Sequence, residues 1–198
     1  MWKDRWSGAL AIALVAGASA ACGGPSELSS DEAAELTAEL AGAGITGASS
    51  GLAGSPAQSG QLEATPIPFS RTVSHTQSCS GGGSISVSGS LSGSIDSETH
   101  DGSLSLNVTQ SFTDCRITRG GKDFTVSGSP NLQLSGTITI VNGLPSGPQT
   151  LSFTGAFRWS AADGRSGSCD IDLTISWSLA SPSTVTGTAC GHQISRQV

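Results

Sequence analysis

The sequence contains no tyrosine, and aromatic residues make up only 5% of its 198 positions. So few aromatics do not supply the two interfacial girdles of a membrane-spanning β-barrel, and this class is disfavoured. Charged residues amount to 12%, lysine occurs only at Lys3 and Lys122, and the formal net charge is −6. Without a basic surface for phosphates to follow, we predict no nucleic-acid partner.

Motifs that carry chemistry are also missing. There is no His-Glu-x-x-His, Cys-x-x-Cys or glycine-rich phosphate loop, so zinc and nucleotide chemistry lose their usual sequence support and we expect no cofactor. Residues 47–51 match the letters of a hydrolase nucleophile elbow, but no strand pattern precedes them and no helix pattern follows. The three histidines, His75, His100 and His192, are isolated in the sequence. We therefore predict no catalytic residue and expect a protein that is not an enzyme.

The first residues have the pattern of a secretion signal. Lys3 and Arg5 precede an apolar run from Ala9 to Ala18, which is too short to span a bilayer but is typical of a signal-peptide core. The run ends in the sequence Ser-Ala-Ala-Cys-Gly, with its cysteine at Cys22. The pattern predicts export from the cytoplasm.

The sequence around Cys22 resembles the lipobox of bacterial lipoproteins, in which small residues such as Ala20 and Ala21 precede the cysteine that is acylated. This resemblance implies that residues 1–21 are a signal peptide and that a lipid on Cys22 anchors the chain in the outer membrane or another periplasm-facing membrane. It places the mature protein in the cell envelope, outside the cytoplasm, with an envelope protein or polymer as a possible partner. The alternative is plain signal-peptidase cleavage after Ala18-Ser19-Ala20.

The sequence has five cysteines, and an odd count is unusual in a secreted chain. Lipidation of Cys22 leaves four, which an oxidising compartment allows to form two disulfides. Three connectivities are possible. Cys79 and Cys115 bracket one two-strand unit and Cys169 and Cys190 bracket another, so we favour pairing within each unit. Cys190 is out of phase with the apolar row of its strand, which requires a bulge or a strand end there.

Residues 22–60 differ in character from the rest of the chain. Ser29 and Glu32 have the spacing of a capping box, and Leu36 and Leu40 share a face, which together predict a short helix. Five carboxylates and no lysine or arginine lie between residues 22 and 60, so we expect a solvated acidic face. From Gly42 to Gly60 the chain is mostly glycine, alanine and serine, which predicts a flexible tether.

From residue 61 to residue 198 the dominant period is two. Serine occupies every even position from 84 to 94, opposite an odd row of Ile85, Val87, Gly89, Leu91, Gly93 and Ile95. Similar alternation recurs over residues 104–112, 132–140, 151–159 and 171–177. This pattern predicts an all-β domain with a single antiparallel, strongly curved sheet, or a small barrel or sandwich, of about seven or eight strands.

Glycines interrupt the apolar rows at six strand positions: Gly89, Gly93, Gly128, Gly136, Gly155 and Gly187. We interpret them as points where the sheet bends, with close approach of a ligand as the alternative. We interpret Trp159 and Trp177 as core residues, with a ligand platform as the alternative. The loop with Asp96, Glu98 and Asp101 is a weak candidate for calcium, although acidic hairpin tips are ordinary solubility features, and we predict no metal site.

Three classes of function remain. The first is a lipoprotein whose β domain binds a protein or envelope polymer or serves a structural role. The second is a carrier that holds a small apolar molecule inside the β domain. A secreted hydrolase is the third. A hollow interior would favour the carrier over the other two.

Overall fold

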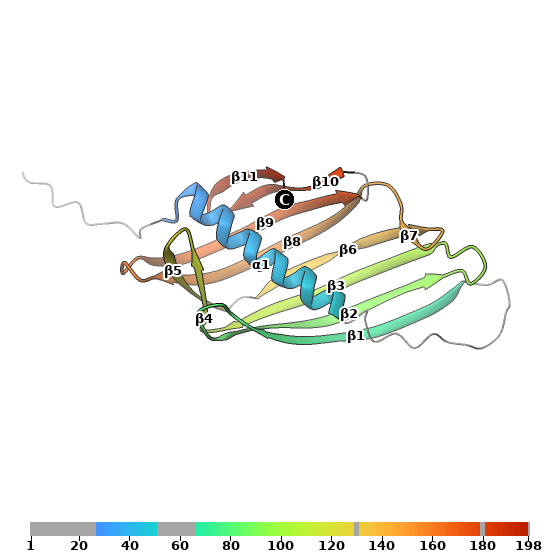
Figure 1. The fold of residues 1–198 in the computed structure, drawn as a ribbon, viewed down its shortest axis with the longest axis horizontal. Helices are drawn as coiled ribbons and strands as arrows, with labels where there is room; N and C mark the ends of the chain where they lie inside the picture. Colours follow the sequence, from blue (N-terminus) through green and yellow to red (C-terminus); the bar gives the residue numbers. More distant parts are fainter. Residues whose placement is uncertain (1–26, 51–65, 129–130, 179–180, 198) are drawn as a thin grey trace, which may run out of the picture.

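The computed structural model describes residues 27–50, 66–128, 131–178 and 181–197. These residues form one helix, α1 (Ser30–Ser50), and eleven strands that belong to a single antiparallel sheet (Figure 1). The strands are β1 (Ile67–Ser78), β2 (Ser84–Ile95), β3 (Gly102–Thr113), β4 (Cys115–Arg119), β5 (Lys122–Ser127), β6 (Leu132–Val141), β7 (Leu144–Pro145), β8 (Gln149–Ala161), β9 (Ser166–Ser178), β10 (Ser181–Ala189) and β11 (His192–Gln197). The prediction of a mainly β protein with an antiparallel sheet is confirmed.

The sheet is open, with β1 at one edge and β11 at the other. Its main order is β1-β2-β3-β6-β8-β9-β10-β11, while β4 pairs with β5, and β7 pairs with β6. β5 and β6 both pair with the same side of β8, at residues 158–161 and 150–155 respectively. The predicted number of strands, seven or eight, is wrong. The count falls short because β4, β7 and β11 have only five, two and six residues, too few for a period of two to separate them from turns.

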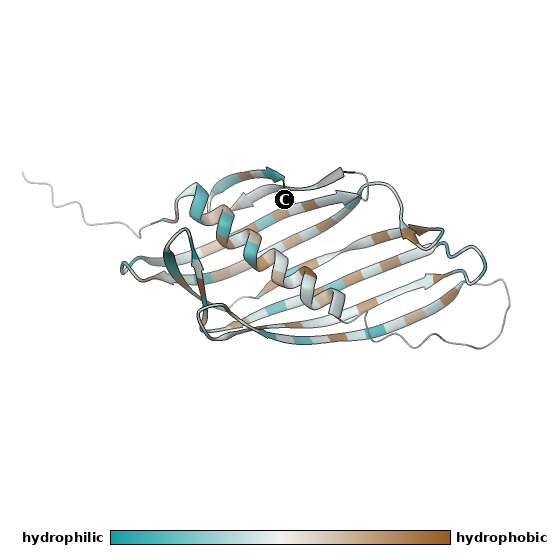
Figure 2. Cartoon of the chain, viewed as in Figure 1, coloured by the Kyte–Doolittle hydropathy of each residue, from teal (hydrophilic) through white to brown (hydrophobic). Residues whose placement is uncertain are grey.

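The two rows of each strand have different surroundings. In β3 the buried row contains Leu104, Leu106, Val108 and Phe112, and the intervening residues are mostly exposed. Figure 2 shows apolar residues alternating with more polar ones along the strands that α1 crosses. On the exposed row, hydroxyl side chains hydrogen-bond across strands, for example Thr76 with Ser86 at 3.1 Å. The sheet therefore has an apolar inner face and a hydroxylated outer face.

Two of the strand glycines are required by the backbone. Gly155 and Gly187 have φ angles of 128° and 135°, a region that other residues rarely adopt. A Cβ atom would lie 2.4 Å from the Asn131 carbonyl oxygen at Gly155 and 2.2 Å from the Asp172 carbonyl oxygen at Gly187. At these positions the neighbouring strand's backbone occupies the space of a side chain.

Helix α1 packs on the inner face of the sheet and extends further than predicted. The expected tether from Gly42 to Gly60 is wrong for residues 42–50, which are helical and bury Ala43, Gly44, Gly47 and Ala48. Their small side chains let the helix approach the sheet closely, and a Cβ on Gly47 would lie 2.6 Å from Val87 Cγ2. Composition predicted a tether because it ignores this packing, which stabilises a helix of low intrinsic propensity.

Several predictions lie outside the described residues. They include the signal peptide over residues 1–21, the lipid on Cys22, the rest of the predicted tether over residues 51–60, and the domain boundary at residue 61.

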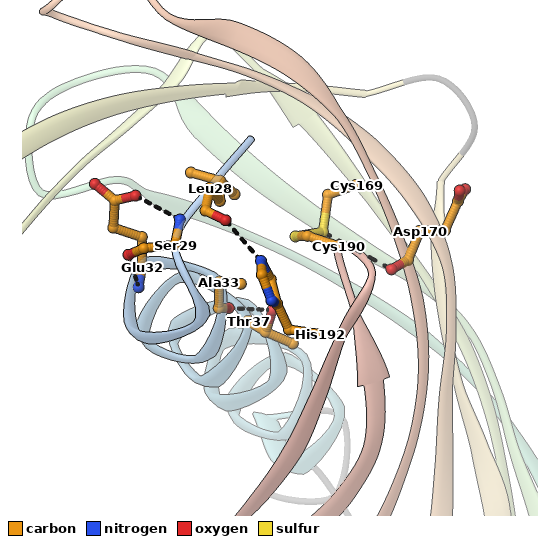
Figure 3. Close-up of a disulfide and its surroundings, with 9 residues drawn as sticks. All are labelled: Leu28, Ser29, Glu32, Ala33, Thr37, Cys169, Asp170, Cys190 and His192. Atoms are coloured by element: carbon orange, nitrogen blue, oxygen red, sulfur yellow. Dashed lines mark hydrogen bonds between the residues drawn. A yellow bond between two sulfur atoms is a disulfide. The ribbon is translucent and has the colours of Figure 1, made fainter. Parts of the chain in front are cut away.

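The structure forms two disulfides, Cys79–Cys115 and Cys169–Cys190, with Cα–Cα distances of 5.5 and 4.3 Å. The predicted pairing within each two-strand unit is confirmed. Cys190 follows the last residue of β10 and has a φ of 51°, so it occupies the strand end that its phase required (Figure 3). Figure 3 also shows the strands curving around α1 near this disulfide.

We expect reduction of the disulfides to lower the thermal midpoint by roughly 10 °C or more, because bonds that close loops of this size contribute about 3–4 kcal/mol each. The cysteines of the two bonds are 36 and 21 residues apart. The measurement is thermal unfolding followed by circular dichroism, with and without dithiothreitol. The double variants Cys79→Ala/Cys115→Ala and Cys169→Ala/Cys190→Ala should each show part of the loss, and an unchanged midpoint in both would contradict the prediction.

Candidate functional site

A cavity of about 510 Å³ lies between the C-terminal part of α1 and the inner face of the sheet. The helix contributes Ala38, Ala41, Gly42, Ile45, Ala48 and Ser49. Strands β2, β3, β6, β8, β9 and β10 contribute the floor, which includes Leu91, Leu104, Leu106, Ile138, Ile175 and Trp177. Among the described residues, no charged side chain lines the cavity, and its polar groups are the hydroxyls of Ser49 and Ser183 and the indole N–H of Trp177. The volume and lining are those of a site for a small apolar ligand.

The cavity arises from a change of residue size along the helix. In the N-terminal half, Leu36 and Leu40 fill the space above the sheet and are 1% and 0% exposed. After Leu40 the apolar residues of the helix are alanines and glycines, except for Ile45. Ile45 lines the cavity yet is 42% exposed, so the cavity opens to solvent beside it.

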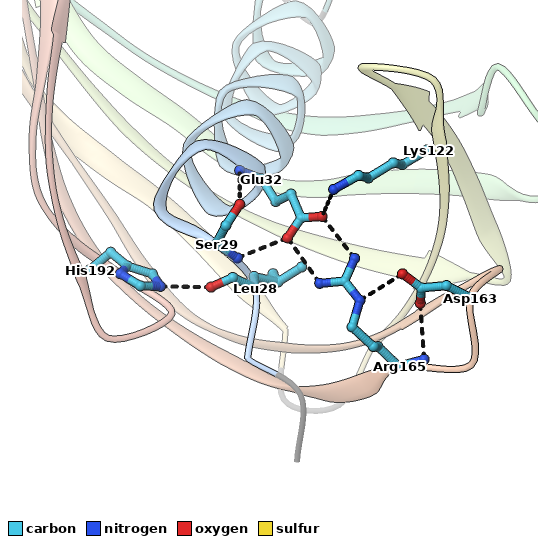
Figure 4. Close-up of polar contacts among 7 residues, drawn as sticks. All are labelled: Leu28, Ser29, Glu32, Lys122, Asp163, Arg165 and His192. Carbon is cyan, nitrogen blue, oxygen red and sulfur yellow. Dashed lines mark hydrogen bonds and ion pairs between the residues drawn. The ribbon is translucent and has the colours of Figure 1, made fainter. Parts of the chain in front are cut away.

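The N-terminal half of α1 is attached to the sheet by a buried ion-pair cluster around Glu32 (Figure 4). The carboxylate of Glu32 accepts hydrogen bonds from Arg165 Nη2 at 2.8 Å, Arg165 Nη1 at 3.1 Å and Lys122 Nζ at 2.5 Å. It also accepts a bond from the Ser29 backbone N–H at 2.8 Å, while Ser29 Oγ accepts one from the Glu32 N–H at 3.3 Å. The predicted capping box is confirmed, and the same carboxylate ties the helix to two hairpin turns.

Electrostatics keep this cluster ionised. Hydrogen bonds from Arg165, and then from Lys122 and Ser29, hold the pKa of Glu32 far below its usual value, although burial opposes the shift. Glu32 and Asp163 together raise the pKa of Arg165. The charges of the Glu32–Arg165 pair therefore persist at any physiological pH.

Further polar contacts hold the same half of the helix. Arg119 pairs with Glu39, Arg196 Nη2 lies 3.1 Å from Asp31 Oδ1, and His192 Nε2 lies 2.7 Å from the Leu28 carbonyl oxygen. The expectation of a solvated acidic face is therefore wrong for Glu32, which is 7% exposed. The sequence placed Arg119, Lys122 and Arg165 beside the turn signals Gly120-Gly121 and Asp163-Gly164, but only the structure shows that these turns meet the acidic helix.

The C-terminal half of α1 differs. Within the described residues, the hydroxyls of Ser49 and Ser50 bond to carbonyls of the helix itself, and no polar side chain of residues 41–50 bonds to the sheet. This half rests on van der Waals contacts of small residues alone. Among the described residues, one end of the helix is thus held by ion pairs as well as packing, and the end beside the cavity by packing.

The other candidate residues have structural roles. Asp96 Oδ1 accepts hydrogen bonds from the Glu98 and Thr99 N–H groups at 2.8 and 2.9 Å, which lower the pKa of Asp96. Asp101 Oδ1 accepts one from the Asn142 N–H at 2.8 Å. The two aspartates thus stabilise loops, and in the part of the chain that the structure describes no group of three or more His, Cys, Asp or Glu residues is placed to hold a metal ion.

The other motifs from the sequence lie in different parts of the fold. Residues 47–50 of the elbow-like sequence lie inside α1, without the strand and turn that such an elbow needs. The histidines lie on β1, in the turn between β2 and β3, and on β11. Trp159 is 3% exposed and packs edge-on against Phe124 with ring centroids 6.4 Å apart, whereas Trp177 lines the cavity. The core interpretation therefore holds for Trp159, and Trp177 belongs to the candidate site.

Comparisons of the chain with models of known protein families, with curated proteins and with solved structures find no match. Across the described segments, no helix has the length and apolar character needed to cross a membrane.

We expect Glu32→Gln to destabilise the protein by about 1–2 kcal/mol near pH 7, because it removes the charge that pairs with Lys122 and Arg165 and leaves Arg165 with Asp163 alone. The folded-state pKa of Glu32 is depressed below the usual 4.5, so its contribution is complete above about pH 4.5 and is lost as the pH falls further. Urea unfolding between pH 7 and pH 2 should therefore show a shallower acid loss in the variant than in the wild type.

The matched control for this prediction is Glu98→Gln, which neutralises an exposed loop carboxylate. Its stability at pH 7 should stay within about 0.5 kcal/mol of the wild type. Equal stability of Glu32→Gln and wild type at pH 7 would show that the cluster does not fix the helix.

Proposed function

We propose that the protein is an exported, lipid-anchored carrier of the cell envelope that holds a small apolar molecule between α1 and the sheet. Among the function classes predicted from the sequence, the carrier is best supported by the uncharged cavity of about 510 Å³. Export and the anchor on Cys22 rest on the N-terminal sequence, and the two disulfides are consistent with an extracytoplasmic location.

The apolar lining of the cavity favours an occupant. The cavity opens to solvent beside Ile45, so its leucine, isoleucine and tryptophan side chains contact water when it is empty. A bound apolar molecule shields this lining from water, which is favourable by about 25 cal/mol per Å² of apolar area covered.

The lining also indicates the kind of molecule. The floor is formed by leucine and isoleucine side chains and the indole of Trp177. These groups select by shape and apolar area, and no charge is available to neutralise an ionised ligand inside the cavity. The carrier function therefore applies to hydrocarbon-like chains or rings.

Filling the cavity should prevent binding. We expect N-phenylnaphthylamine, a neutral fluorescent probe, to bind saturably to the wild type, and Ile138→Trp to weaken this binding by about tenfold or more because the indole occupies the ligand's space. The measurement is probe titration, together with energy transfer from Trp177 in a Trp159→Phe background.

The control is Val141→Trp, which adds the same side chain to the same strand on its opposite, exposed face. It should bind the probe like the wild type. Absence of saturable binding by the wild type, or equal binding by both tryptophan variants, would contradict the carrier function.

The anchor is tested separately. We expect Cys22→Ala to abolish incorporation of radioactive palmitate in a bacterial host and to release the protein in soluble form, because the acylated thiol is lost. Ser19→Leu, which brings the segment closer to the lipoprotein pattern, should keep the label. Continued labelling of Cys22→Ala would disprove the anchor and leave the cavity unaffected.

A further inference from the structure

Gln110 is a polar residue in an apolar layer. It lies in the inner row of β3 and is 0% exposed. Within the described part of the chain, neither its Nε2 nor its Oε1 atom has a hydrogen-bond partner. A buried amide without partners destabilises the folded state, so its presence calls for a physical reason.

The other buried glutamine, Gln149, differs from Gln110 because its polar atoms are hydrogen-bonded. Gln149 is 3% exposed, its Oε1 accepts a hydrogen bond from the Thr139 N–H at 2.9 Å, and its Nε2 donates to the Ser146 carbonyl oxygen at 2.5 Å. Both polar atoms of the Gln149 side chain are thus hydrogen-bonded, and these bonds stabilise the loop between β7 and β8. Gln110 has the same chemistry and a deeper position, yet both of its polar atoms are free to bond.

The position of Gln110 connects it with the cavity. It lies on the same face of β3 as Leu104 and Leu106, which line the cavity, and the rise of a strand places it about 14 Å along β3 from Leu106. Gly44 of α1 covers it, and a Cβ on Gly44 would lie 1.8 Å from Gln110 Nε2. Ala41 and Ala48, one helical turn to either side of Gly44, both line the cavity.

The segment of α1 above Gln110 contacts the sheet through packing, and among the described residues it makes no polar side-chain contact with the sheet. It contains Gly42, Gly44 and Gly47. Gln110 does not itself line the cavity, so a bound molecule can reach the amide only if this segment shifts. The ion-paired N-terminal half can remain in place during such a shift.

We propose that Gln110 is the polar contact of the bound molecule, which is then a neutral amphiphile. Its apolar body fills the cavity, and a hydroxyl, ester or amide group bonds to the Gln110 side chain. An amide offers both a donor and an acceptor, which suits such groups, whereas an ionised head group would find no counter-charge in the lining. This inference rests on the proposed carrier function and adds the chemical class of the ligand.

The test compares two ligands on three proteins. Dodecanol and dodecyl chloride have the same alkyl chain, but only the alcohol donates a hydrogen bond, and their dissociation constants are measured by displacement of N-phenylnaphthylamine. In the wild type, dodecanol should bind about tenfold more tightly than dodecyl chloride, the factor expected of one hydrogen bond. Gln110→Met, which keeps a similar volume, should remove this preference and leave dodecyl chloride binding unchanged.

Thermal unfolding of the ligand-free proteins gives a second, independent result. Gln110→Met should raise the thermal midpoint because it removes an unsatisfied buried amide, whereas the control Gln149→Met should lower it and retain the preference for dodecanol. A lowered midpoint in Gln110→Met would overturn the proposal, as would an equal effect of this variant on both ligands. If neither ligand binds the wild type, the carrier function itself fails.

Discussion

The structure depends on the attachment of α1 to the sheet through Glu32. Its carboxylate bonds to Arg165 and Lys122, at the turns that follow β8 and β4, and also caps the helix through Ser29. Gly42, Gly44 and Gly47 lower the intrinsic stability of this helix, so packing and polar contacts with the sheet are needed for it to persist. A buried carboxylate held by two cations supplies the polar contacts, and Asp163 holds Arg165 in place from its other side.

Fixing one end of the helix divides the interior into two parts. Leu36 and Leu40 fill the part near the ion pairs, and the alanines and glycines that follow leave the rest hollow. The filled part, together with two disulfides, stabilises the fold. The hollow part is lined by leucine, isoleucine and tryptophan side chains, which are open to solvent or to a ligand. The ion pairs and the cavity therefore lie at opposite ends of one helix.

The sequence-based predictions were correct for features that depend on nearby residues and wrong for several that depend on distant segments. Strand alternation, the Ser29–Glu32 capping box and the pairing of Cys79 with Cys115 depend on neighbours in the chain or on adjacent strands, and all were predictable. The tether from Gly42 was wrong because the same composition suits a linker and a helix packed closely on a sheet. The short strands β4, β7 and β11 were missed because their identity comes from pairing with β5, β6 and β10 rather than from their own pattern.

By itself the sequence determined that the chain alternates between apolar and hydroxylated residues, that its sheet is antiparallel, and that its cysteines can pair locally. These properties arise from side chains a few positions or one hairpin apart. Only the tertiary structure decided that Glu32 is buried, that Gln110 lacks a partner and that a cavity lies beneath α1. Glu32 and Arg165 are 133 positions apart, and the cavity is enclosed by seven elements. Such features depend on the relative placement of distant segments, which no local pattern encodes.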